Sequence, residues 1–142
     1  MNALDDTAYD LVVVRRTEDA EGVALIELEA ATDRPLPRWQ PGAHIDVLLP
    51  GGEARQYSLS GTPGSTTWRI GVLREDAGRG GSTWIHDTLV PGATVRVAGP
   101  RNHFEFIPDR GTRYLFIAGG IGITPIASMI AAAAAAGVDY RL

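Results

Sequence analysis

The sequence predicts a mainly β fold, a small barrel or sandwich of antiparallel strands, followed by the first strand and helix of an α/β unit. Between residues 9 and 98, short runs rich in β-formers alternate with turns that contain glycine or proline, which is typical of small all-β domains. After residue 112 the pattern changes to one apolar run, a glycine-rich turn and an alanine-rich helix. We therefore expect a first domain over residues 1–108 and the incomplete start of a second over 109–142.

Length and composition narrow the class of protein. The 142 residues suffice for one domain and part of another, and 44% hydrophobic with 21% charged residues is ordinary for a globular protein. The net charge of −4 gives no electrostatic footprint for nucleic acid or an anionic membrane. There is no cysteine, which excludes disulfides and cysteine-held iron–sulfur clusters within this chain. The acidic start, Met1 to Asp6, lacks the features of a signal peptide, so we expect a cytoplasmic location.

Two hairpins are predicted in the first half of the chain. Residues 9–16 and 23–30 flank a turn at 17–22, and residues 43–49 pair with 55–60 across Pro50-Gly51-Gly52. Glycine and proline positions predict the remaining elements in the same way. They are a proline-containing loop at 32–37, strands at 67–73 and 93–98, a turn at 99–104 and a linker at 107–111.

The strand at 55–60 carries an unusual combination of side chains. Arg55, Tyr57 and Leu59 share one face, while Gln56, Ser58 and Ser60 share the other. A guanidinium for a phosphate, a ring for stacking and a short hydroxyl suit a phosphorylated, flat, heteroaromatic ligand. Taken alone, these residues favour a half-exposed strand with ordinary polar side chains, because such mixtures are common.

A glycine-rich loop, Gly78-Arg79-Gly80-Gly81, leads into a short predicted helix with Ser82 as its N-cap. Backbone N–H groups at such a helix start, with the hydroxyls of Ser82 and Thr83, attract an anion. The alternative is a flexible loop ahead of a capped surface helix. Arg55 strengthens the interpretation of this loop as a phosphate site, because it lies upstream on a strand from which its guanidinium can reach the same phosphate.

The last thirty residues predict half of a βαβ unit. Arg113 to Ala118 is a continuous apolar run, as in a parallel strand buried on both faces. The turn Gly119 to Gly122 then opens a helix with Thr124 as N-cap and Pro125 at its first position, which Gly137 ends. Residues 138–142 begin another strand. One such unit cannot bury both faces of its strand, so a complete nucleotide domain is absent from these residues.

Four motifs in order resemble the ferredoxin–NADP reductase superfamily, in its phthalate dioxygenase reductase and vanillate demethylase reductase branch. These motifs are Arg55-Gln56-Tyr57-Ser58-Leu59, Gly78-Arg79-Gly80-Gly81-Ser82, Gly99-Pro100-Arg101-Asn102-His103-Phe104 and Gly119-Gly120-Ile121-Gly122-Ile123-Thr124-Pro125. The resemblance implies a six-stranded antiparallel Greek-key barrel that holds FMN rather than FAD. It also implies a second domain for NADH or NADPH, and a [2Fe–2S] domain in a C-terminal part that is missing from these 142 residues. We therefore expect the chain to be truncated.

The resemblance also implies roles for individual residues. Arg55, Gly80, Gly81 and Ser82 would hold the FMN phosphate; Gln56, Tyr57 and Ser58 would contact the flavin, with Ser58 near its N5; and Val72 and Leu73 would line it with backbone groups. Gly119, Gly120, Ile121, Gly122, Ile123, Thr124 and Pro125 would face the nicotinamide, and Ser58 and Thr124 would be the catalytic pair. Ser60 departs from the family, in which cysteine is common at this position.

The resulting expectation is a flavin-dependent NAD(P)H oxidoreductase that passes electrons through FMN to an iron–sulfur or Rieske oxygenase partner. The alternative is a barrel module without flavin that associates through the apolar strand 114–118. An oligonucleotide-binding barrel fits worst, because basic residues are not clustered. His44, His86 and His103 lack the spacing of metal ligands, and Trp39, Trp68 and Trp84 are predicted to lie in the core or at the barrel rim.

Overall fold

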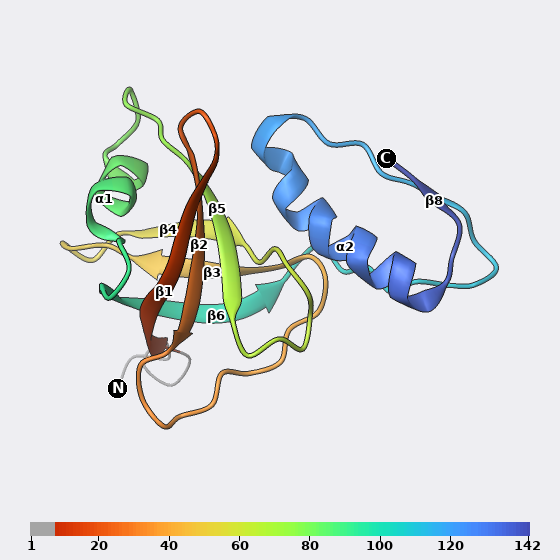
Figure 1. Ribbon diagram of the computed structural model, residues 1–142, viewed down its shortest axis with the longest axis horizontal. Helices are drawn as coiled ribbons and strands as arrows, with labels where there is room; N and C mark the ends of the chain where they lie inside the picture. Colours follow the sequence, from red (N-terminus) through yellow and green to blue (C-terminus); the bar gives the residue numbers. More distant parts are fainter. Residues whose placement is uncertain (1–7) are drawn as a thin grey trace.

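The computed structural model describes residues 8–142, so the acidic segment 1–6 lies outside the described residues. Six strands form one antiparallel sheet in the order β4-β3-β6-β1-β2-β5 (Figure 1). A bridge between Ser60 and Arg69 joins the chain after β4 to β5, so the sheet curls into a barrel. The predicted six-stranded antiparallel barrel is therefore confirmed. The strands are β1 (Ala8–Ala20), β2 (Val23–Ala30), β3 (Ala43–Leu48), β4 (Ala54–Ser58), β5 (Trp68–Leu73) and β6 (Thr94–Asn102).

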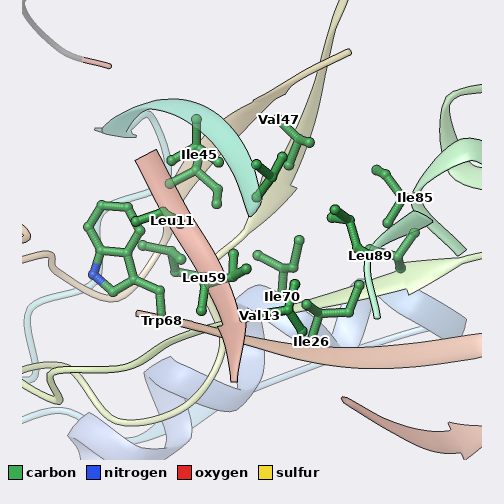
Figure 2. Close-up of a cluster of buried hydrophobic side chains, with 14 of the residues drawn as sticks. Leu11, Val13, Ile26, Ile45, Val47, Leu59, Trp68, Ile70, Ile85 and Leu89 are labelled. Carbon is green, nitrogen blue, oxygen red and sulfur yellow. The ribbon is translucent and has the colours of Figure 1, made fainter. Parts of the chain in front are cut away.

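The barrel core follows the period of two that the sequence shows. In β5, Trp68, Ile70 and Val72 are fully buried, and β2 alternates in the same way. Figure 2 shows side chains from most of the strands meeting in one cluster with Ile85 of helix α1 (Gly81–Thr88) and Leu89, which follows that helix. Complete burial of one such aliphatic side chain contributes roughly 1.5–3 kcal/mol. This cluster holds the strands that carry the site residues.

Two strands run further than predicted. The turn expected at 17–22 is only Glu21-Gly22, because β1 continues to Ala20 through two irregularities in its pairing with β2. Likewise, the first part of the turn expected at 99–104 lies in β6. After a register shift, β6 pairs with the start of β3, opposite Ala43 and His44. The predicted ends of β1 and β6 were wrong because they depend on pairing with strands that are distant in the sequence, which local patterns do not show.

The C-terminal part has its own small core. Strands β7 (Tyr114–Leu115) and β8 (Tyr140–Arg141) pair in parallel, and helix α2 (Ile123–Ala136) connects them after a 3₁₀ turn at Gly120–Gly122. Phe116 is buried among helix residues, whereas Leu115 and Ile117 are 70% and 82% exposed. Helix α2 covers only one face of this strand, as expected of a single strand–helix unit, which cannot bury both faces. Phe106 precedes the predicted domain boundary between residues 108 and 109, yet its ring packs on Tyr114 and Phe116 beyond that boundary. The division of the chain into two domains at this point therefore stays a proposal.

Both predicted helix starts need correction. Helix α1 begins at Gly81 after Gly80, whose φ of 89° only glycine adopts readily, so Ser82 lies inside the helix and is not its N-cap. Helix α2 begins at Ile123, which places Thr124 and Pro125 in its first turn. Pro125 is tolerated there because the first N–H groups of a helix have no partner within it. Within residues 8–142, no helix combines the length and hydrophobicity needed to cross a membrane.

Candidate functional site

A cleft of about 420 Å³ lies between the barrel and the start of α2. This volume is in the range of small-molecule sites. Five parts of the chain meet there: β4, β5, the loop after β5, the start of α1 and the turn before α2. The lining residues are Arg55, Gln56, Tyr57, Ser58, Gly71, Leu73, Glu75, Ser82, Ile121, Gly122, Thr124 and Pro125. In Figure 1, α2 lies beside the barrel on the β5 side. The lining residues come from both of these parts of the chain.

Most of the predicted site residues line this cleft, and some do not. The side chain of Val72 is buried in the barrel core, and its carbonyl oxygen lies 2.7 Å from Nε2 of His86. Gly119, Gly120 and Ile123 lie outside the lining and are exposed. Gly80 and Gly81, at the start of α1, are also outside the lining. Gly71 and Glu75 are lining residues that the sequence analysis did not name; a glycine inside an alternating strand was the available signal for Gly71.

Arg55 projects from β4 toward the start of α1. Its side chain is 20% exposed, and its guanidinium contacts a carboxylate oxygen of Glu53 at 2.9 Å and donates to the carbonyl of Ala54 at 3.0 Å. A Cβ added at Gly81 would lie 2.8 Å from both Cγ and Nε of Arg55. Gly81 is therefore needed for the arginine to pass this close to the helix. Arg55 and the first turn of α1 face the same side of the cleft.

Hydroxyl groups fix the start of α1 in the cleft wall. The Ser82 hydroxyl oxygen accepts a hydrogen bond from the Glu75 N–H at 2.9 Å, and the Thr83 hydroxyl donates to the Gly80 carbonyl at 2.9 Å. The loop between β5 and α1 is also held by Arg74, which contacts Asp76 and Asp87 at 2.8 Å each. The hydrogen bond from Arg74 lowers the pKa of Asp87 below its usual range. The helix start thus presents its free N–H groups from a restrained loop.

Tyr57 and Ser58 form the floor beside Arg55. They stand opposite Ile45 and His44 in the β3–β4 ladder, which sets their direction. Tyr57 is half-buried against the barrel core, and burial raises the pKa of its phenol, although nearby Arg55 acts in the opposite direction. A neutral ring with one face packed on the core offers an apolar surface for stacking.

The start of α2 forms the opposite wall. The Thr124 hydroxyl donates to the carbonyl of Ile121 at 3.0 Å, which turns its methyl group toward β5. Ile121, Gly122 and Pro125 complete this wall. The wall therefore combines a glycine-containing turn with the free N–H groups of a helix start.

A second hollow of about 320 Å³ adjoins the cleft and shares Gln56 and Ser58 with it. The rings of His44 and His103 meet there edge to face, with centroids 5.5 Å apart. Burial, followed by the charges of Arg101 and His103, lowers the pKa of His44. The described residues 8–142 include no group of three or more potential metal ligands.

The arrangement fits a phosphorylated planar ligand better than a metal ion. Arg55 and the amides of α1 supply cationic and N–H donors on one side, and the space kept open by Gly81 lets them approach together. Tyr57 supplies a ring face next to them. Glu75 is the only carboxylate among the lining residues, and its backbone N–H is tied to Ser82. The cleft can hold a phosphate at one end and a flat ring along β4.

No family model matches the chain. A vanillate O-demethylase oxidoreductase from Pseudomonas putida is 46% identical over 134 residues, which cover 94% of this chain and 42% of that protein. The solved structure of phthalate dioxygenase reductase, a modular structure for electron transfer from pyridine nucleotides to [2Fe–2S], matches with a TM-score of 0.86 at 34% identity. It covers 96% of this chain and 42% of that one. The FAD/NAD-binding domain of a nitric oxide dioxygenase from Vibrio cholerae matches with a TM-score of 0.78 at 26% identity, covering 93% of this chain and 60% of that one.

By fold, the chain is a ferredoxin reductase-like protein, with the barrel of the flavin-binding domains of that class. More narrowly, its sequence and structure are similar to the corresponding part of proteins of the phthalate dioxygenase reductase and vanillate demethylase reductase branch, as its four motifs indicated. The chain spans about two-fifths of the length of the curated relatives it matches.

Proposed function

We propose that this chain is the flavin-binding part of an NAD(P)H-dependent reductase, and that its flavin is FMN. The observation that carries the proposal is the meeting of Arg55, the start of α1 and Tyr57 at one cleft. Arg55 and the α1 amides bind the phosphate, Tyr57 packs on the ring, and Ser58 donates a hydrogen bond at the ring edge. When bound, the flavin supplies hydride acceptance and one-electron transfer.

The start of α2 serves the nicotinamide in this proposal. Glycines at 119, 120 and 122 have no side chains, so a flat ring can approach the backbone there and come close to the flavin. Thr124, with its hydroxyl held by Ile121, orients that ring. Hydride moves with its electrons, so Ser58 and Thr124 act by positioning and need not take up a proton.

Electrons then leave to an iron–sulfur centre of an oxygenase system. Support comes from the relatives, which are named as reductase subunits or oxidoreductases of such systems.

The cytoplasmic location stays a prediction. Association through the strand at 114–118, where Leu115 and Ile117 are exposed, also stays a prediction.

Flavin uptake by the purified 142-residue chain tests the proposal. We expect a yellow protein, or one that becomes yellow when FMN is added and excess FMN is removed by gel filtration. Titrations with FMN and FAD, followed by flavin fluorescence, are expected to favour FMN. A chain that is folded by circular dichroism but takes up neither flavin would contradict the site and favour the module without flavin.

Gly81→Ala is expected to weaken FMN binding about tenfold, which corresponds to about 1.4 kcal/mol. The added methyl group would lie 2.8 Å from the Arg55 side chain, so the guanidinium must move away from the start of α1. Fluorescence titration measures the effect. Gly111→Ala is the matched control, because its new Cβ would meet only a carboxylate oxygen of Asp109 at 3.7 Å. Equal affinities for the two variants would mean that Arg55 does not need its present position.

A further inference from the structure

Gly71 lies in the middle of β5, between two residues that point into the barrel. Ile70 and Val72 are fully buried in the core, so position 71 faces the outside of the barrel. A Cβ added there would lie 2.8 Å from Cγ2 of Thr124, and 3.5 Å from both Cδ1 of Ile121 and Cδ2 of Leu25. The start of α2 therefore rests on a spot of the barrel wall that has no side chain.

This contact is directional. The hydroxyl of Thr124 is committed to the carbonyl of Ile121, so the methyl group is the part that meets Gly71. Leu25 stands opposite Gly71 on β2 and closes the remaining side. A side chain at 71 would be caught between Leu25 and Thr124, and the easier movement is for the turn before α2 to lift from the barrel. Packed cores resist such overfilling.

We propose that Gly71 is a positioning residue that sets the width of the cleft. Through the Thr124 methyl group, it fixes how closely the glycine turn of α2 approaches the β4 side, where Arg55, Tyr57 and Ser58 lie. Any side chain at 71 opens the cleft, and removal of the Thr124 methyl restores room for a small one. The inference rests on the proposed function only for its ligand readout, because the position of α2 is measured separately.

Spin-label distances measure the position of α2 directly. The chain has no cysteine, so Asp19→Cys on β1 and Ala134→Cys on α2, both at exposed sites, give clean labelling. We expect Gly71→Ala to shift the label distance away from that of the unsubstituted background, and Gly71→Ala with Thr124→Ser to return it. Gly111→Ala, which lies outside the cleft, is expected to leave it unchanged. An unchanged distance in Gly71→Ala overturns the inference.

FMN affinity gives the second readout. We expect Gly71→Ala to weaken binding about tenfold and the added Thr124→Ser to restore it to within about threefold. If the unsubstituted chain takes up no FMN, the proposed function fails while the label distances still test Gly71. If Gly71→Ala does not fold, the double variant Gly71→Ala with Thr124→Ser tests the steric contact instead. Its recovery of the fold supports the steric contact with Thr124, and its failure to fold overturns the inference.

Discussion

Arg55→Ala is expected to weaken FMN binding about a hundredfold, the largest effect of any single cleft residue. A hydrogen bond to a charged group contributes about 1.5–3 kcal/mol, and a guanidinium can make two to one phosphate. Arg55 is held next to the start of α1, so its loss removes the cationic part of the phosphate site. Fluorescence titration of the purified variant measures the change.

Riboflavin provides the matched ligand for this variant, because it carries the ring without the phosphate. We expect its affinity to change less than about threefold in Arg55→Ala. Arg96→Ala is the matched protein control, since Arg96 pairs with Asp10 on the barrel and does not line the cleft. Equal losses for FMN and riboflavin would show that Arg55 supports the fold instead of the phosphate.

Gly42→Ala is expected to lower the free energy of unfolding by about 3 kcal/mol or more. Gly42 has a φ of +96°, and a Cβ there would lie 1.8 Å from the backbone oxygen of Phe104. The turn that follows β6 is fixed at this point, because Asn102 donates to the Pro41 carbonyl at 3.0 Å and accepts from the Phe104 N–H at 2.9 Å. Urea denaturation followed by tryptophan fluorescence measures the loss.

Gly51→Ala separates backbone strain from steric conflict. Its φ of +93° is nearly the same, but a new Cβ would meet nothing within 4 Å. The left-handed conformation alone costs roughly 1–2 kcal/mol. We expect Gly51→Ala to lose about that amount, and the excess in Gly42→Ala to report the conflict with Phe104. Similar losses in both variants would remove this explanation for Gly42.

Much of the barrel could be predicted from local patterns. Alternating apolar residues and glycine or proline turns determine β2, β3 and β5, because side chains with a period of two must share one buried face. The ends of β1 and β6 could not be predicted in this way, since they depend on register shifts against distant strands. Each helix start was two residues off, because Gly80 and Gly122, not the hydroxyl residues Ser82 and Thr124, occupy the N-cap positions.

The candidate site was only partly accessible to sequence reasoning. Arg55, Tyr57, Ser58 and Ser82 have chemistry that indicates a phosphate and a ring, and the structure brings all four to one cleft. The role of Gly71 depends on how closely two separate parts of the chain approach, which no local pattern encodes. Glu75 was missed for a similar reason, because its place depends on the path of a loop.

The decisive measurement for the phosphate site is the position of the phosphorus atom in a crystal structure of the chain with FMN. We expect the phosphate to lie within hydrogen-bond distance of the Arg55 guanidinium and of N–H groups in the first turn of α1, with the ring against Tyr57. A phosphate bound away from α1, with the Arg55 guanidinium still on Glu53 and the Ala54 carbonyl, would contradict this site.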